Sequence, residues 1–424
     1  MDSNDLFNVN LAQSQQLVDK VNGEFYGQFN YPWPPIFFQS FVDSGMQTML
    51  NHDLGYFSSA RVPEHAKIWV AGCGTNQALI TALKFPQATV VGTDISKQSL
   101  EICQKNIDNL GVTNLKLYER SINEVDYKEE FDYIICTGVI HHNANPEFTL
   151  MKLSDALSKD GVLELMVYNY YHRITTTACQ KAIKNLCGSA TDFNLQLDLT
   201  KRLIDTYPAK NLMSDFLSAY KHSQGAELAD AFIQPVEYSY TVESLNKLLN
   251  TCGLEYLLPC ANQFDKERKT HYWNMEFGDT ELKRRYQQLP DHSRWNITNL
   301  IMLNESPMLW FYIQKKDSTY NRRSEKEIVE EFFQTKFEKF MSLTQEYILD
   351  KSGTYQLDPT QKFFPPADSS SDELSAYILN NLDSNLTMRD VFRKLGVEES
   401  FQNINRVRIN LTTVQFPYLS AVES

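Results

Sequence analysis

Several features that would assign this chain to a class at once are missing from its sequence. Its 424 residues contain no stretch approaching the roughly 18 consecutive apolar residues of a membrane span. Met1 to Val9 lack the charged and then apolar pattern of a secretory signal. We therefore expect a cytoplasmic protein without a membrane partner.

Paired cysteines are also missing. The seven cysteines are an odd number, and no two of them form a CxxC pair. This pattern argues against a disulfide framework and against a zinc site, so we expect no metal and mostly buried thiols. The cysteines stand at positions 73, 103, 136, 179, 187, 252 and 260.

Clusters of basic residues are scarce. Lys and Arg number 40 against 53 Asp and Glu, a formal charge of −13, and the longest basic run is Lys283-Arg284-Arg285. Because an acidic protein repels phosphate backbones, we do not expect a nucleic-acid partner. The 42% apolar and 22% charged content is that of an ordinary soluble globular protein. The length favours two or three units, or one large core with appended pieces.

The most regular part of the chain runs from Lys67 to Tyr168, where short apolar runs alternate with segments of helical period. This alternation is typical of βαβ units and a parallel sheet. Five strands are predicted, at Ile68 to Ala71, Thr89 to Thr93, Leu115 to Glu119, Tyr133 to Thr137 and Val162 to Tyr168. Helices are predicted at Gln77 to Lys84, Lys97 to Leu110 and Glu147 to Leu157.

Together with this stretch, the remaining segments divide the chain into five predicted parts. They are an N-terminal lid or extension (1–60), the first half of an α/β core (61–168), a helical cap insertion (169–235), the second half of the core (236–316) and a C-terminal accessory domain (317–424). Aromatic and proline-rich residues around Tyr31 to Pro35 favour an extended N-terminal segment. The end of the chain predicts a mainly helical unit whose spacing resembles a winged helix. Its acidic charge favours packing or partner contact over DNA reading.

A glycine loop follows the first predicted strand, in Gly72-Cys73-Gly74-Thr75-Asn76. Glycine is needed where the backbone turns tightly and must approach a ligand. Asp94 closes the second strand 20 residues beyond Gly74, where a carboxylate can accept hydrogen bonds from both ribose hydroxyls. The pair indicates a nucleoside site; the alternative is that the glycines only turn the chain while Asp94 caps a helix.

These motifs resemble the class I S-adenosylmethionine-dependent methyltransferases. The resemblance covers Lys67 to Tyr168, Thr241 to Leu258 and Met308 to Ile313, with motifs in the family's order. It implies a Rossmann-like α/β fold: a seven-stranded, mostly parallel sheet whose last strand, Met308 to Ile313, is antiparallel. It also implies S-adenosylmethionine as cofactor and S-adenosylhomocysteine as product. The chain departs from the family in carrying Val70 where many members have a carboxylate, and Asn76 for the third glycine.

The resemblance also implies which residues bind the cofactor. Gly72, Cys73 and Gly74 would line its methionine part, with Asn76 beside them, and Asp94 would hold the ribose. Adenine would contact Ile95, Ser121 and Ile122, and Thr137 would lie near the sulfonium.

Candidate residues for catalysis and for the acceptor come from the loop after the fourth predicted strand, the end of the fifth strand and the N-terminal segment. His142 or His141 is a candidate general base, and Tyr168 joins them as a catalytic candidate. Each histidine has an alternative role in shaping the cofactor pocket. The acceptor-binding candidates are Tyr26, Trp33, Tyr171 and Arg173, where Arg173 would pair with a carboxylate or else be a surface residue of the cap.

The resulting hypothesis is a methyltransferase that acts on an O or N nucleophile of a small-molecule, amino-acid-like or natural-product acceptor. A peptide or protein side chain is the alternative acceptor. A non-catalytic scaffold that keeps the fold is an alternative of another class, and a nicotinamide-dependent enzyme is a distant third. The aromatic N-terminal segment suggests a homodimer.

Overall fold

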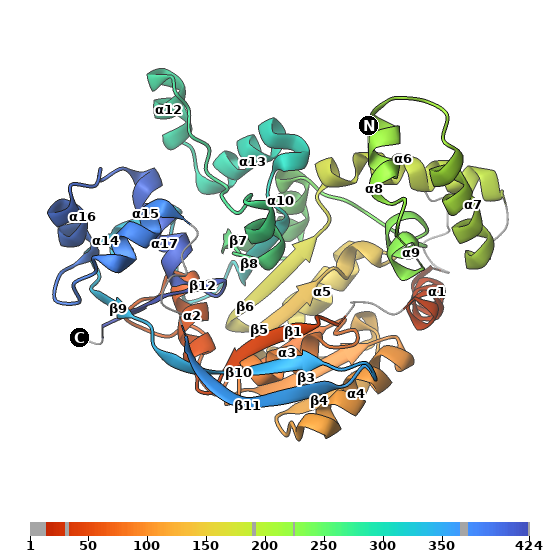
Figure 1. Ribbon diagram of the computed structural model, residues 1–424, viewed down its shortest axis with the longest axis horizontal. Helices are drawn as coiled ribbons and strands as arrows, with labels where there is room; N and C mark the ends of the chain where they lie inside the picture. Colours follow the sequence, from red (N-terminus) through yellow and green to blue (C-terminus); the bar gives the residue numbers. More distant parts are fainter. Residues whose placement is uncertain (1–13, 30–33, 189–191, 224, 365–371, 423–424) are drawn as a thin grey trace.

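The structure, a computed structural model, describes residues 14–29, 34–188, 192–223, 225–364 and 372–422. At its centre lies a seven-stranded sheet in the order β4-β3-β2-β5-β6-β8-β7 (Figure 1). Strand β8 runs antiparallel to both neighbours, and the others are parallel, which confirms the predicted fold. The strands are β2 (Lys67–Ala71), β3 (Thr89–Asp94), β4 (Leu115–Glu119), β5 (Phe131–Thr137), β6 (Leu157–Val167), β7 (Leu254–Pro259) and β8 (Leu309–Lys315).

The central strands are apolar in sequence because both faces of the sheet are covered by helices. One face packs on α2 (Gly45–Asp53), α3 (Gln77–Lys84) and α4 (Lys97–Leu110). The other packs on α5 (Pro146–Ala156), α10 (Val242–Thr251) and α13 (Asp291–Met302). The bounds of α3 and α4 agree with the prediction, and α4 begins at a Ser96 cap and ends at Gly111 in the left-handed conformation, φ 65°.

The insertion after β6 is helical, as predicted, and lies at the right of Figure 1. It has a small apolar core of its own, which also takes in Phe25 and Phe29 of the N-terminal region. Its helices are α6 (Tyr170–Cys187), α7 (Phe193–Thr206), α8 (Leu212–Ala219) and α9 (Ala226–Phe232).

The prediction of an extended N-terminal segment is wrong for residues 14–28. The chain forms α1 (Ser14–Gln28), and Phe25 and Tyr26 are helical residues. The helix forms because its apolar residues recur at helical spacing and can pack on the insertion. Trp33 lies outside the described residues.

The C-terminal region contains more strand than predicted. Strands β10 (Ser342–Leu349) and β11 (Tyr355–Phe364) form a hairpin, and β10 also pairs with β1 (Phe37–Phe41). Short strands β9 (Phe337–Lys339) and β13 (Leu419–Ala421) pair with each other, and β12 spans Phe416–Pro417. The helices are α14 (Glu325–Gln334), α15 (Glu373–Asn380), α16 (Met388–Leu395) and α17 (Phe401–Thr412).

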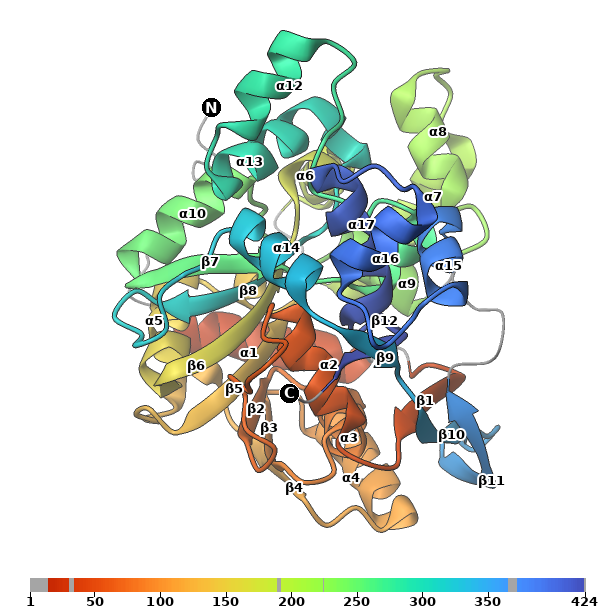
Figure 2. The same cartoon turned by 90° about the vertical axis from the view of Figure 1, so that its left-hand side faces the viewer.

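The C-terminal helices pack on the main body. Helix α17 lies against α2, as Figure 2 shows from the side. The long connection between β7 and β8 forms α11 (Gln263–Arg268), α12 (Thr280–Gln287), α13 and the 3₁₀ turn Leu303–Glu305. Two further 3₁₀ turns, Ile122–Glu124 and Ile140–His142, follow β4 and β5.

A buried ionic network joins α13 to α14. The Arg294 guanidinium donates to Asp291 (2.7 Å) and to Glu325 (3.1 Å), and all three side chains are 3% exposed or less. Arg322 binds the other oxygen of Asp291 at 2.8 Å. The indole of Trp295 also donates to Glu325, at 3.2 Å.

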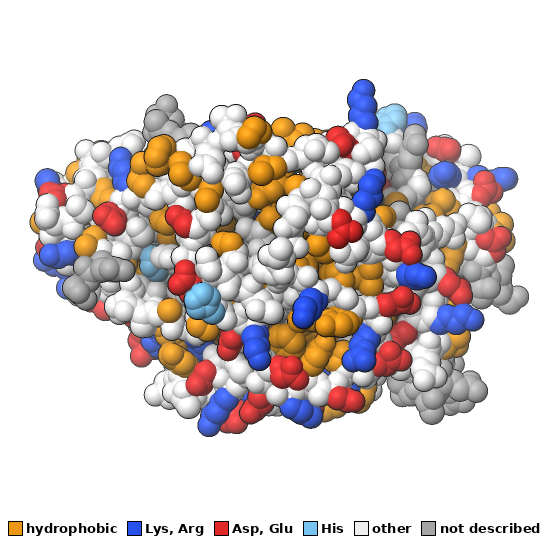
Figure 3. Space-filling model, turned by 90° about the horizontal axis from the view of Figure 1, so that it is seen from below, with side chains coloured by type: hydrophobic (Ala, Val, Ile, Leu, Met, Phe, Trp, Pro, Cys, Tyr) orange, Lys and Arg blue, Asp and Glu red, His pale blue; other side chains and the backbone are white. Residues whose placement is uncertain are grey.

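Other sequence-level expectations concern burial and surface. All seven cysteines are free, and six are buried, as predicted. No helix in the described ranges is long and apolar enough to cross a membrane. On the face seen in Figure 3, basic and acidic side chains are interspersed, so neither sign dominates that surface.

Candidate active site

A cavity of about 410 Å³ opens at the carboxyl ends of β2, β3 and β5. It continues along β5, β6 and β8 on the side of the sheet that packs on α2 and α3. Parallel sheets bind their ligands at this edge. Ten of the residues predicted as site residues line it: Tyr26, Gly72, Gly74, Asn76, Asp94, Ile95, Ser121, Ile122, Thr137 and His142.

The glycine loop has the conformation that a close ligand requires. Gly72 and Gly74 have φ of 73° and 53°, in the left-handed region. A Cβ at Gly72 would lie 2.5 Å from Cγ2 of Val139, so a larger residue cannot be placed there without movement. The buried thiol of Cys73 lies outside the cavity lining.

Asp94 is anchored by this loop. Its two oxygens accept backbone hydrogen bonds from Gly74 (2.7 Å) and Ser96 (2.8 Å). Burial raises the pKa of this carboxyl, and the hydrogen bonds oppose the rise. A carboxylate has about four acceptor sites, so beside these backbone bonds the group can still receive a ribose hydroxyl.

Helix α1 covers the same end of the cavity. Asp19 accepts a hydrogen bond from Ser121 at 2.6 Å, and Asn22 donates to the carbonyl of His142 at 2.8 Å. The amide oxygen of Asn22 lines this site without a hydrogen-bond partner in the described part of the chain. An unpaired buried acceptor and a glycine cradle fit a polar nucleoside cofactor.

His142 has the geometry of a base. Its Nδ1 lies 2.8 Å from the carbonyl of Val236, to which it can donate, and this tautomer leaves Nε2 as an acceptor. Burial lowers the pKa of the imidazole, while Glu237, the Val236 carbonyl and Asp230 act in the opposite direction. The ring is therefore neutral at physiological pH.

His141 and Tyr168 lie behind the cavity. The ring of His141 is fully buried, 3.9 Å from that of Tyr168 and 4.3 Å from that of His142. Neither of its nitrogens has a hydrogen-bond partner in the described part of the chain. Burial lowers its pKa well below the usual range, so it packs as a neutral ring.

Arg173 is already paired within the protein. Its guanidinium binds Glu237 through two hydrogen bonds of 2.8 and 2.6 Å and lies over the Tyr168 ring at 4.4 Å. Gln180 also donates to Glu237, at 3.0 Å. Neither Arg173 nor Tyr171 lines the cavity, so the structure does not bring these two predicted acceptor residues to it.

The sequence analysis did not predict the end of the cavity away from the glycine loop. Lys84, Tyr133, Glu164 and Trp310 line it, from α3, β5, β6 and β8. One signal was present in the sequence: Glu164 is a lone carboxylate within the apolar run of β6. A charge in a strand covered on both faces needs a partner, and such groups are functional candidates.

Asp53 is a buried carboxyl that contacts Tyr312 of the cavity lining, and it predicts that the stability of the protein depends on pH. It is 2% exposed and accepts hydrogen bonds from Tyr312 (3.1 Å) and Val414 (3.4 Å). Burial raises its pKa from 3.8 to about 7. The folded protein therefore retains this proton after the unfolded chain has lost it, and stability falls as pH rises toward 7.

We expect Asp53 to account for a loss of about 2 to 3 kcal/mol in unfolding free energy between roughly pH 5 and 8. Asp53→Asn should remove this part of the pH dependence of the unfolding free energy, measured by urea titration at several pH values. Asn is chosen because its amide oxygen can accept the same hydrogen bonds. The exposed Asp317→Asn is the control and should keep the wild-type slope. Equal slopes in all three proteins would contradict the raised pKa.

The sheet order, the antiparallel β8, the glycine loop and the anchored Asp94 together define the class I methyltransferase fold. Comparison with known proteins agrees. Residues 66–207 match the family described as "Methyltransferase domain". Residues 66–207 are therefore similar in sequence to this methyltransferase domain, and the sheet that they begin has the class I methyltransferase fold.

Individual relatives extend this likeness in sequence. An uncharacterized protein of Synechococcus sp. is 27% identical over 285 residues, 64% of this chain and 66% of that protein. An uncharacterized protein of Rickettsia prowazekii is 32% identical over 127 residues, 29% of this chain and 48% of its own. The (S)-coclaurine N-methyltransferase of Papaver somniferum is 28% identical over 109 residues, 26% of this chain and 31% of the enzyme. The chain thus spans less than two thirds of the length of these curated relatives.

Solved structures share the fold. PKMT2 from Rickettsia typhi superposes with a TM-score of 0.57 at 15% identity, covering 92% of this chain and 77% of that one. The same protein in complex with AdoHcy gives a TM-score of 0.55 at 16% identity, with 93% and 78% covered. At these identities the likeness concerns the fold.

Proposed function

We propose that the protein transfers a methyl group from S-adenosylmethionine to an oxygen or nitrogen of a small-molecule, amino-acid-like or natural-product acceptor. The observation that carries the proposal is one continuous cavity, in which the Gly72 and Asp94 end suits the cofactor and the remaining volume is left for an acceptor. The curated relatives include an N-methyltransferase and a malonyl-[acyl-carrier protein] O-methyltransferase, which act at nitrogen and oxygen respectively. The partners implied are the acceptor alone, without nucleic acid or membrane; the homodimer stays a prediction.

The chain's own residues would mainly align the reactants and exclude water. The cofactor supplies an electrophilic methyl carbon on its sulfonium. Asp94 and the glycine loop bind its nucleoside, and α1 covers it. When bound, the cofactor would give up this methyl carbon to the acceptor atom, and the electron pair of the carbon–sulfur bond would stay on sulfur. His142 takes the proton that the acceptor releases.

The test is a calorimetric titration of the full chain with S-adenosylhomocysteine. We expect micromolar binding, which Asp94→Ala weakens by about 1.5 to 3 kcal/mol because charge-assisted hydrogen bonds to the ribose are lost. Asp132→Ala is the control, since its carboxylate binds the amide of Lys67 at the opposite end of the sheet.

Unchanged binding in Asp94→Ala would contradict the assignment of the pocket. Absence of binding by the wild-type chain would contradict the proposed function. A chain that binds the cofactor but methylates no small molecule would favour the alternatives, a peptide or protein acceptor or a non-catalytic scaffold.

A further inference from the structure

The end of the cavity away from the glycine loop carries two opposite charges that do not form an ion pair with each other. We call it the charged arm and define it by Lys84, Tyr133, Glu164, Trp310 and Tyr312. Met46 and Leu50 of α2, the segment 260–264 and the turn Val414–Gln415 complete its walls. Gln263 and Phe264 are exposed, so the arm reaches the surface beside α11.

Glu164 supplies the negative charge. In the sheet register it stands between Ile135 and Tyr312. Its carboxylate accepts hydrogen bonds from the Tyr133 hydroxyl and from the Trp310 indole, the latter at 2.8 Å. These two donors hold the group in place, while burial raises its pKa. The carboxylate keeps further acceptor sites for a ligand.

Lys84 supplies the positive charge. It is the last residue of α3, and it is half-buried with its side chain lining the arm. Across the described ranges its ammonium takes part in no ion pair within 4.0 Å, although it lies near enough to Glu164 for each to influence the other's pKa. Burial lowers the pKa of Lys84 and Glu164 opposes that effect.

Two separated charges among aromatic side chains are costly to bury unless a ligand pairs with both. A ligand that carries both an ammonium and a carboxylate can pair with both charges. A simple amine would leave Lys84 unpaired, and a simple acid would leave Glu164 unpaired. We propose that the charged arm binds a free α-amino acid as the methyl acceptor, with its ammonium at Glu164 and its carboxylate at Lys84.

The proposal deepens the proposed function and rests on it, because a side-chain oxygen or nitrogen of that amino acid would receive the methyl. The cofactor also has an amino-acid end. However, the arm lies away from the cofactor end of the cavity: β6 is two strands from β2, a separation of about 10 Å. Glu164 also stands two residues before Met166, which pairs with Thr137 at the end of β5.

The experiment saturates the full chain with S-adenosylhomocysteine and titrates it with each of the standard amino acids by calorimetry. We expect at least one amino acid to bind with a millimolar or lower dissociation constant. Its amide and its N-acetyl derivative, which each lack one charge, should bind at least tenfold more weakly. Glu164→Gln and Lys84→Met should each weaken the parent amino acid at least tenfold.

Two further measurements separate this proposal from its competitors. The exposed Lys116→Met is the matched control and should bind like the wild type. Affinity for S-adenosylhomocysteine should stay within twofold in the Glu164 and Lys84 variants, which also reports that they fold. The proposal is overturned if no amino acid binds. It is also overturned if both variants lose affinity for S-adenosylhomocysteine but keep it for methylthioadenosine, since the arm would then bind the amino-acid end of the cofactor. If the wild type binds no S-adenosylhomocysteine, the proposed function itself fails.

Discussion

Arg294→Met should lower the free energy of unfolding by about 3 to 5 kcal/mol. Arg294 is 1% exposed, and its guanidinium pairs with Asp291 and Glu325, which are 3% and 2% exposed. Its removal leaves Asp291 paired with Arg322. Glu325 then has no ion pair within 4.0 Å among the described residues, and the charge of the buried Arg408 acts on it from farther away. An unpaired buried carboxylate costs far more than the ion pair itself contributes. Urea unfolding followed by circular dichroism measures the change.

Two further variants show whether charge is the cause. Arg294→Met combined with Glu325→Gln should recover a substantial part of the loss, because no buried charge is then left unpaired on α14. Arg284→Met removes a solvent-exposed ion pair with Glu281 and should cost less than about 1 kcal/mol. A loss below about 1 kcal/mol for Arg294→Met would mean that the network does not bind α13 to α14.

His142→Gln should lower kcat by about 10² to 10⁴-fold with an acceptor that must lose a proton. The neutral imidazole donates from Nδ1 to Val236, so Nε2 remains to accept that proton. The measurement is the rate of S-adenosylhomocysteine formation. Because burial lowers the pKa of His142 below its ordinary 6.5, the wild-type rate should be flat at neutral and alkaline pH and should fall on acidification.

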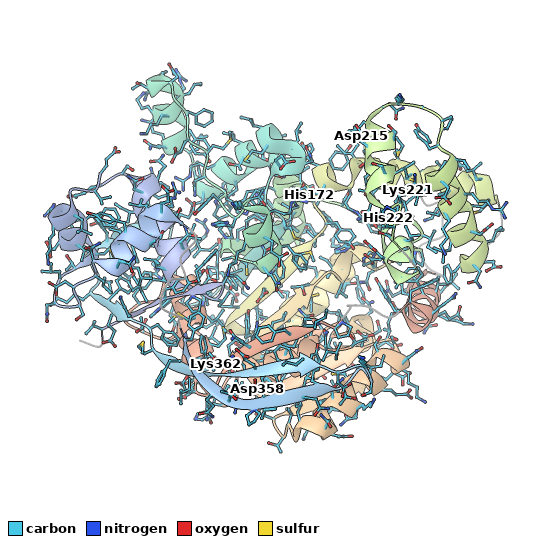
Figure 4. The ribbon with its side chains drawn as sticks, viewed as in Figure 1. His172, Asp215, Lys221, His222, Asp358 and Lys362 are labelled. Atoms are coloured by element: carbon cyan, nitrogen blue, oxygen red, sulfur yellow. The ribbon has the colours of Figure 1, made fainter. Side chains whose placement is uncertain are left out.

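His172→Gln is the control for this variant. His172 stands at the start of α6, labelled in Figure 4, and its Nε2 lies 2.8 Å from the carbonyl of Ser306. It does not line the cavity, so kcat should be unchanged. An unchanged kcat in His142→Gln, with cofactor affinity retained, would show that the acceptor needs no base.

The strands, the glycine loop and Asp94 could be predicted because each depends on neighbours in the chain. The run Val70-Ala71-Gly72 predicts the end of a buried strand and the turn that follows it. The structure has β2 ending at Ala71, and α3 and β3 follow where the sequence predicts a helix and a strand. The residues proposed to bind the cofactor at this loop can for this reason be predicted from the sequence.

Features that depend on distant residues could not be predicted. Arg173 is an acceptor candidate by position, but its partner Glu237 is contributed by a segment 64 residues later. Helix α1 was obscured by the proline-rich residues after it, and the β1–β10 pair joins opposite ends of the chain. In the sequence, Lys84 is the polar last residue of an amphipathic helix. Its closeness to Glu164 follows only from the arrangement of the strands in the sheet.

Figure 4 also shows how far the appended regions lie from one another. Asp215, Lys221 and His222 stand together on the helical insertion, whereas Asp358 and Lys362 lie on β11 on the far side of the sheet. Substitutions at these residues should leave ligand binding in the cavity unchanged, since none of them lines it.

The pairing of β1 with β10 has a consequence for synthesis on the ribosome. Phe37 faces Ile348 across this pair, and β11 completes the sheet. The strand made first must therefore wait, unpaired, until most of the chain has emerged. Since domains generally fold as they are synthesised and unpaired strand edges aggregate, Phe37–Phe41 is the segment for which a chaperone would matter most during translation.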